Sequence, residues 1–338
     1  MTGMAIAESP KMLAQTDAIP LTVVGELRDP AVAHYWMAVA CCPSCGSTTR
    51  TAEATLSDGL YAFGTERVAF PEQGVKVIEC GGCGLFYKSM VPTPAYLADV
   101  IRRQGEAKWT VPHDFRLEVM ILKLLNQGKA FDLLDVGAAG GSLLEACAAS
   151  SVTERRAALD VMRYAGIERH LAGEFIEGFL DDPVLTWGHE PYDVVTLFDV
   201  LEHLYQPRIA FENLRSLVRR DGLVYLETGN AGSFWPRRLG ISQWWYVRLL
   251  EHHVFWSRAA LAYAAAEHGF RIVFWREGRH KSRRGLSPAA IAGDLLKTAL
   301  YFVTGAQYAG IAHVFGKQGN QPWYPFARDH FQACLVRE

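Results

Sequence analysis

The sequence predicts an α/β fold in which helices cover a mostly parallel sheet, preceded by a small cysteine-rich module. Two observations carry this prediction. Apolar strand-like runs alternate with helix-like stretches from residue 131 onward, and four cysteines form two CxxC pairs between residues 42 and 83. Strands and helices that alternate at this spacing build βαβ units, whose ligands bind at the carboxyl ends of the strands.

The first strand-like run leads into a glycine-bearing turn. In FDLLDVGAAGGSLL, residues 131–144, an apolar stretch closed by Asp135 is followed by Gly137 and Gly141 and then by a helix-like pattern. Glycine adopts backbone angles closed to other residues and lets a ligand approach the main chain, while the next helix offers free N–H groups at its start. The turn is therefore typical of a nucleotide site, although many α/β folds contain such turns.

Further apolar runs follow this turn in a regular order. The next one ends in Asp160, 25 residues after Asp135, where an acid can bind ribose hydroxyls. Strand-like runs then occupy residues 174–182, 191–204, 221–230 and 271–275. Helix-like stretches separate most of these runs, which favours a parallel sheet.

At this point the chain resembles class I S-adenosylmethionine-dependent methyltransferases. The residues that carry the resemblance are LLDVGAAGG, the acid of ALDV, YDVV with DVLEHL, DGLVYLETGN and HHVFWSRAALAYAAAEHGF, within about residues 115–338. The resemblance implies a Rossmann-like, seven-stranded sheet whose last strand, here within residues 329–338, is antiparallel. One departure is Ala139, which stands where the family's usual loop has a glycine and sets the middle of the loop slightly further from the cofactor.

The resemblance also implies where S-adenosylmethionine binds. Glycines of the turn would flank its methionine portion, Asp160 would take the ribose hydroxyls, and Phe179 or its neighbour would lie against adenine. For Phe179 and Phe198, ordinary core packing is the alternative. The cofactor-binding residues expected on this basis lie at turns and strand ends: Asp135, Gly137, Ala138, Gly141, Asp160, Val161, Phe179, Leu180, Phe198 and Asp199.

The DVLEHL segment holds the candidate catalytic residues. Asp199, Glu202 and His203 are spaced i, i+3, i+4, so they would share one helical face if a helix begins at the strand end. His203 is then a candidate general base at neutral pH, with Glu202 and His253 as further catalytic candidates. The alternative is that Glu202 and His203 only brace the helix. Some similar methyltransferases hold Mg²⁺ or Mn²⁺ at such an element, which leaves a metal at these four residues as another alternative.

The two cysteine pairs predict a metal site. Cys42-Pro-Ser-Cys45-Gly and Cys80-Gly-Gly-Cys83-Gly are separated by 34 residues, and four thiolates so arranged suit tetrahedral Zn²⁺. Four cysteine ligands leave no open position for substrate or water, so the zinc is predicted to be structural. Buried or disulfide-linked thiols are the alternative. The three other cysteines suggest no disulfide plan, which favours a reducing compartment.

The organisation expected along the chain has four parts: a partly ordered leader at residues 1–40, the zinc-binding module at 41–90, a helical linker or lid at 91–130, and the cofactor domain at 131–338 with a helical insertion at about 277–325. The leader lacks the order of a secretion signal, so a cytoplasmic location is expected. Residues 298–316 contain no Asp, Glu, Lys or Arg but include glycines, Gln and His. This favours a packed helix or interface over a membrane span, with membrane contact as the alternative.

The acceptor is predicted only as a class. Seven aromatic residues lie between Phe234 and Trp256, which suits the wall of an acceptor pocket or a core. The basic run from Arg276 to Arg284 suits a phosphate-bearing acceptor, although a solvated loop is the commoner explanation of such a run. The prediction is methyl transfer to O, C or N of a small molecule in secondary or surface-glycan metabolism.

Two other classes of function are alternatives to this one. An RNA methyltransferase could use the zinc module to contact RNA. The net charge of −2, and the presence of only three lysines or arginines between residues 42 and 83, disfavour a nucleic-acid surface. A protein that binds the donor without turnover is the third class. The sequence predicts no oligomeric state.

Overall fold

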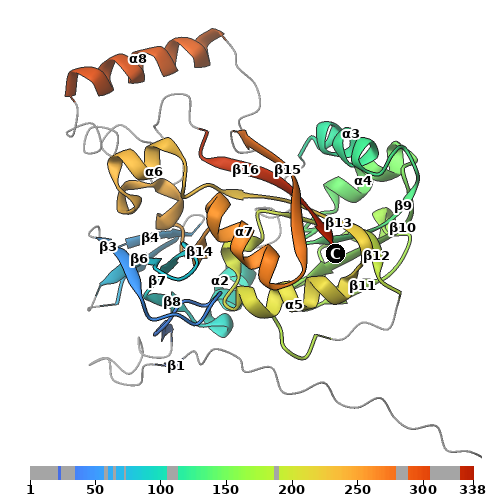
Figure 1. The fold of residues 1–338 in the computed structure, drawn as a ribbon, viewed down its shortest axis with the longest axis horizontal. Helices are drawn as coiled ribbons and strands as arrows, with labels where there is room; N and C mark the ends of the chain where they lie inside the picture. Colours follow the sequence, from blue (N-terminus) through green and yellow to red (C-terminus); the bar gives the residue numbers. More distant parts are fainter. Residues whose placement is uncertain are drawn as a thin grey trace, which may run out of the picture.

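The computed structural model describes residues 22–23, 35–56, 60–63, 66–71, 74–104, 113–185, 190–278, 288–304 and 328–338. Most of the expected leader, and residues 305–316 of the apolar segment, lie outside the described residues. The largest element is a seven-stranded sheet with the strand order β11-β10-β9-β12-β13-β16-β15 (Figure 1). The strands are β9 (Phe131–Val136), β10 (Thr153–Asp160), β11 (Phe175–Glu177), β12 (Tyr192–Phe198), β13 (Val218–Gly229), β15 (Phe270–Gly278) and β16 (His330–Arg337).

The direction of the strands confirms the predicted fold class. Strands β9 to β13 pair in parallel, whereas β16 is antiparallel to both of its neighbours, β13 and β15. The chain starts at β9 in the middle, builds β10 and β11 on one side, and returns to β12 on the other side. The carboxyl ends of β9 and β12 therefore flank a topological switch point, where ligands of open α/β sheets bind.

Two cores form because both faces of the sheet are covered. Leu133 and Val194 belong to one buried cluster, whereas the adjacent Leu134 and Val195 belong to the other. Alternate residues of a strand point to opposite faces, so a strand buried on both sides is a continuous apolar run. Helices α3 (Arg116–Leu125) and α4 (Ser142–Ala149) contribute to the first cluster, and α5 (Pro207–Leu217) and α7 (Arg258–Glu267) contribute to the second.

The cysteine module is built of short antiparallel strands packed beside the large sheet. Its four-stranded sheet has the order β14-β7-β6-β3. Strand β14 comes from the far half of the chain, and the module shares one continuous core cluster with the large sheet. The module therefore packs as one body with the large sheet. Its strands are β1 (Thr22–Val23), β2 (Trp36–Ala38), β3 (Arg50–Leu56), β4 (Leu60–Phe63), β5 (Glu66–Ala69), β6 (Val75–Cys80), β7 (Phe86–Lys88), β8 (Met90–Pro92) and β14 (Val254–Phe255).

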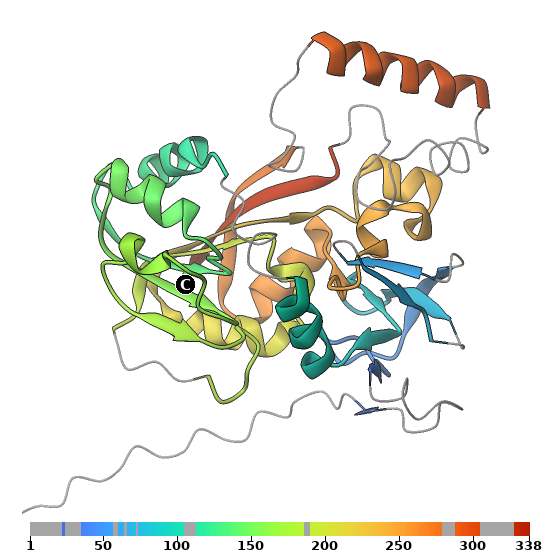
Figure 2. The same ribbon diagram turned by 180° about the vertical axis from the view of Figure 1, so that it is seen from behind.

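The remaining helices connect or extend these two parts. In Figure 2, α2 (Pro94–Gln104) lies between the cysteine module and the large sheet, and α8 (Pro288–Thr304) stands away from the body. Leu296 and Val303 of α8 are 71% and 84% exposed. Within the described ranges, no helix is both long and apolar enough to cross a membrane. The shorter helices are α6 (Phe234–Leu239), η2 (Ile167–His170), η3 (Leu201–His203), η4 (Ile241–Gln243) and η5 (Trp245–Arg248).

Candidate functional site

A pocket lies at the switch point of the large sheet. Its empty volume is about 860 Å³, including space open to solvent, and its walls come from the ends of β9, β10 and β12 and from helix α2. The predicted site residues that line it are Gly137, Asp160, Val161, Phe179, Leu180, Asp199 and His203. Six others are not among its lining residues: Asp135, Ala138, Gly141, Phe198, Glu202 and His253.

The turn after β9 gives the pocket a main-chain floor. Gly137 has φ +70°, and a Cβ placed there would lie 2.6 Å from Cγ2 of Val200, so no other residue fits without movement. Ala139 also adopts a positive φ, 47°, in the place where a glycine was expected. Alanine therefore follows the same left-handed turn at some conformational cost, and its methyl group lies in the pocket wall.

Asp160 projects from the end of β10 into the pocket. It is 7% exposed, and its two carboxylate oxygens accept hydrogen bonds from the N–H groups of Ala139, at 2.8 Å, and Val161, at 2.7 Å. Burial raises the pKa of Asp160 to about 6, and these main-chain donors act in the opposite direction. The carboxylate is thus held rigidly against the glycine turn, with lone pairs left for the hydroxyls of a ligand.

Two predicted residues lie behind the pocket. Asp135 is 5% exposed and accepts a hydrogen bond of 2.7 Å from Thr196 on the neighbouring strand. Phe198 is 7% exposed, and its ring contacts those of Phe115 and Tyr225 at centroid distances of 5.2 and 5.5 Å. Phe198 therefore occupies the core position that was its alternative, whereas Phe179 is 37% exposed at the pocket.

The segment after β12 differs from the expected helix. Asp199 has φ +56°, a left-handed angle that no α-helix continues, and its N–H donates to the carbonyl of Glu227. A single 3₁₀ turn follows over Leu201–His203, and helix α5 begins only at Pro207. The expectation of one helical face is therefore corrected. The tight turn buries Glu202 completely and leaves His203 at the pocket.

Glu202 is the centre of a buried polar cluster. Its Oε1 accepts a hydrogen bond from the hydroxyl of Tyr246, and its Oε2 accepts one of 2.7 Å from Thr228. The Nε2 atoms of His203 and His252 lie 3.9 and 4.0 Å from Oε1. Burial raises the pKa of Glu202 and lowers that of His252 well below its usual value. Cluster members other than His203 lie behind the pocket wall.

The structure selects a different histidine to join Glu202 and His203. The side-chain ligand atoms of Glu202, His203 and His252 all lie within 4.8 Å of one another, whereas His253 is outside this group. His253 is 2% exposed, and its ring packs at 4.1 Å against that of Tyr205. If a divalent cation binds at this segment, these distances favour His252 over His253 as its ligand.

Several residues that line the pocket were not predicted from the sequence. Glu251 lines the pocket from the aromatic segment, and Leu97 and Ile101 reach it from α2. Asp181 also lines it, and its carboxylate accepts N–H donors from Tyr205, at 2.7 Å, and from the next residue, at the start of α5. For Leu97 and Ile101, the apolar spacing within α2 was the only feature of the sequence that could have indicated a place in the pocket wall. The others depend on tertiary contacts across many residues of chain.

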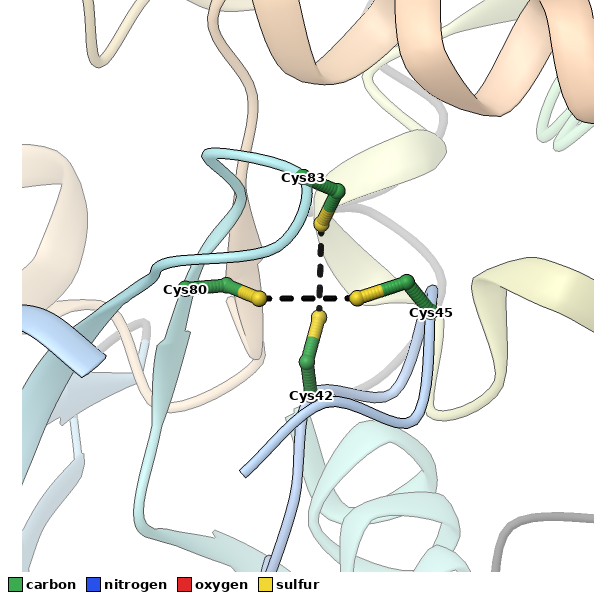
Figure 3. A group of neighbouring side chains, drawn as sticks. All are labelled: Cys42, Cys45, Cys80 and Cys83. Carbon is green, nitrogen blue, oxygen red and sulfur yellow. Dashed lines mark hydrogen bonds between the residues drawn. The ribbon is translucent and has the colours of Figure 1, made fainter. Parts of the chain in front are cut away.

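The four cysteines converge as their spacing predicts (Figure 3). Their sulfur atoms all lie within 4.8 Å of one another, with 3.5 Å between Cys42 and Cys83 and between Cys45 and Cys80. Tetrahedral zinc with bonds of about 2.3 Å sets sulfur atoms roughly 3.8 Å apart, so the arrangement fits the ion. The hydrogen bond from Cys42 lowers the pKa of Cys83, and the same contact raises the pKa of Cys42.

The strand order, the single antiparallel strand and the acid-lined pocket at the switch point define the class I methyltransferase fold. A family model described as "Methyltransferase domain" matches residues 96–273, more than half of the chain. The chain belongs to this family and is an S-adenosylmethionine-dependent methyltransferase.

Curated relatives and solved structures show more distant likeness. The chain is 25% identical over 191 residues to the ubiquinone biosynthesis O-methyltransferases of Salmonella paratyphi A and Escherichia coli O9:H4, covering 54% of this chain and 68% of theirs. A chain in the complex of the Haloferax volcanii Trm112 methyltransferase activator with a methyltransferase is 15% identical, with a TM-score of 0.47, covering 71% of this chain and 95% of that one.

Proposed function

We propose that the protein transfers the methyl group of S-adenosylmethionine to a small-molecule acceptor, with a hydroxyl as the first acceptor to test. The observation that carries the proposal is the pairing of Asp160 with the turn at Gly137 in one pocket, because a carboxylate for ribose and an approachable main chain are what this donor needs. The O-methyltransferase names of the curated relatives support an oxygen acceptor.

The residues fit the donor in named places. Asp160 would bind the ribose hydroxyls beside Val161, Gly137 would contact the methionine portion, and Phe179 with Leu180 would lie against adenine. All five line the same pocket. The bound donor supplies an electrophilic methyl group on a sulfonium. The protein contributes by holding donor and acceptor in line and by excluding water, which provides much of the acceleration in such reactions.

His203 is proposed as the residue that receives the acceptor's proton. Its Nδ1–H donates to the carbonyl of Glu251 at 2.8 Å, which leaves the lone pair of Nε2 free to accept a proton. The side chain is 32% exposed at the pocket, unlike the buried Glu202 and His253. Glu202 lies 3.9 Å from Nε2 and would stabilise the imidazolium that forms. His253 would support the cluster from behind.

Structural zinc at the four cysteines completes the proposal. Cys42, Cys45, Cys80 and Cys83 surround the space for one tetrahedral ion and offer no fifth ligand position. The ion would hold the two CxxC turns together and so stabilise the strands that join the module to the large sheet. A catalytic role for this ion is disfavoured because the four sulfur ligands fill its coordination shell.

The aromatic segment is more core than pocket wall in this structure. Trp244, Phe255 and Trp256 are fully buried and Tyr246 is 2% exposed, whereas Phe234 is 62% exposed. The residue of this segment that lines the pocket is Glu251, which is not aromatic. Residues 279–284 of the basic run lie outside the described residues. A phosphate-bearing acceptor is therefore a proposal from the sequence.

The proposal is tested with purified protein, methyl-labelled S-adenosylmethionine and a small-molecule extract of the source cells. A labelled small molecule, identified by mass spectrometry, is the expected result. A second arm contains RNA in place of the extract, at low salt. Methyl label recovered in that RNA would instead favour the RNA methyltransferase. If calorimetry shows donor binding but neither arm gives a methylated product, the result would favour a protein that binds the donor without turnover. Metal analysis of the same sample should give one zinc per chain.

A further inference from the structure

The loop at residues 249–253 holds the side chain of His203 and the main chain of Glu202 in place. Its Glu251 carbonyl accepts the Nδ1–H of His203 at 2.8 Å, and the N–H of His253 donates to the carbonyl of Glu202 at 2.7 Å. The first contact fixes the tautomer of His203 and the second fixes the main chain of the 3₁₀ turn. Any shift of this loop therefore changes the direction of the Nε2 lone pair at the pocket.

Lys88 of the cysteine module donates a hydrogen bond to each end of this loop. The N–H of Lys88 donates to the carbonyl of His253 at 3.0 Å, and its Nζ donates to the carbonyl of Leu249 at 2.7 Å. Lys88 ends β7, and the two residues before it pair with β14, which follows the loop directly. The loop is thus closed over a single lysine side chain from the other half of the molecule.

Lys88 makes these contacts at an energetic disadvantage. It is 0% exposed, its Nζ lies 4.2 Å from the centre of the Tyr61 ring, and burial lowers its pKa well below the usual value. The nearby Glu251 opposes this effect only in part. A buried amine is costly unless it is hydrogen-bonded, and an apolar side chain of the same length would fill the space more cheaply. The hydrogen bond from Nζ to the loop, together with the contact of Nζ with the Tyr61 ring, compensates for part of this cost.

The same strand is anchored at the zinc site. The N–H of Cys80 donates to the carbonyl of Leu85 at 2.9 Å, which closes the second CxxC turn immediately before β7. Strand β7 also pairs with β6, which ends at Cys80. Short stretches of main chain joined by hydrogen bonds therefore connect the second CxxC turn, through Lys88 and the loop, to His203.

We propose that Lys88 is a positioning residue for methyl transfer, through which the cysteine module sets the orientation and tautomer of His203. The module is on this account a working part of the catalytic site as well as a stabilising one. The inference rests on the proposed function only in the role given to His203. Its chain of contacts is a property of the folded protein and can be measured without turnover.

The test compares Lys88→Met with Lys76→Met in the full chain with zinc present. Methionine keeps the length of the lysine stem and removes only the amine, so folding should be retained. Lys76 is the matched control: it lies on the neighbouring strand β6, and its partner is the exposed Glu53 at 2.5 Å. Thermal unfolding, donor affinity, kcat and the ¹⁵N spectrum of the His203 ring, assigned by its loss in His203→Gln, are measured for each protein.

For Lys88→Met we expect kcat to fall about tenfold while donor affinity stays within about threefold, because one positioning hydrogen bond is lost. The His203 spectrum should move from a single Nδ1–H tautomer toward a mixture, and removal of zinc by a chelator should move it in the same direction. Lys76→Met should change none of these. An unchanged His203 spectrum in Lys88→Met would overturn the inference whether or not an acceptor is known. If the His203 spectrum of Lys88→Met shifts as expected but the wild-type protein transfers no methyl group, only the proposed function would be contradicted.

Discussion

Acidification from pH 7.5 to pH 5 is expected to weaken the binding of S-adenosylmethionine about tenfold. The reason is Asp160, whose pKa burial raises to about 6 and whose ionised carboxylate is the proposed acceptor of the ribose hydroxyls. With that pKa, roughly one molecule in eleven carries the charge at pH 5, whereas nearly all do at pH 7.5. A tenfold loss corresponds to about 1.4 kcal/mol of binding free energy. Isothermal titration calorimetry at the two pH values measures it directly.

The sign of the linkage keeps this prediction separate from unfolding. An acid with a higher pKa in the folded chain than its ordinary value of 3.8 destabilises the fold as it ionises. Asp160 therefore makes the fold more stable as the pH falls from about 6 toward 4, so weaker binding at pH 5 does not follow from its effect on folding. Asp160→Asn should bind weakly with no pH dependence over this range. Glu177→Gln, on the adjacent strand and outside the pocket, should behave as wild type. Equal wild-type affinities at pH 5 and 7.5 would refute the role of Asp160.

Three further predictions concern the turn, the base and the metal. Gly137→Ala places a methyl group 2.6 Å from Val200, so it should cost roughly 2–4 kcal/mol of stability and abolish donor binding. The control Gly46→Ala, at φ +73° with open space around it, should cost roughly 1 kcal/mol of stability. Equal losses of stability in the two variants would contradict the packing argument. His203→Gln should lower kcat about 100-fold with donor affinity kept, and normal turnover would leave it a bracing role. Cys45→Ser, or chelation of zinc, should lower Tm on the order of 10 °C; an unchanged Tm would argue against a structural metal.

The sheet could be predicted because its local signals agree with its tertiary structure. The runs at β9, β10, β12 and β13 are buried on both faces, so each appears in the sequence as an apolar stretch ended by a polar residue. Asp160 and Gly137 follow from the same signal, since a strand end and a turn are local features. The four cysteines needed only their spacing. In each of these cases a few neighbouring residues determine the structure.

The segment that carries the proposed base was harder to predict because its geometry depends on distant segments. The positive φ of Asp199 breaks the helix expected from the i, i+3, i+4 pattern, and no local signal announces it. Adjacent histidines also cannot be distinguished by spacing alone: His252 meets Glu202, whereas His253 turns toward Tyr205. Their directions are set by the loop that Lys88 holds from a different part of the chain.

The most direct test of the central claim is a crystal structure of the protein soaked with S-adenosylhomocysteine. The account predicts this nucleoside in the pocket at the ends of β9 and β10, with both ribose hydroxyl oxygens within about 3 Å of the Asp160 carboxylate. Its homocysteine part should run along the turn at Gly137, and adenine should lie beside Phe179. An empty pocket at saturating ligand, or a ribose bound away from Asp160, would contradict it.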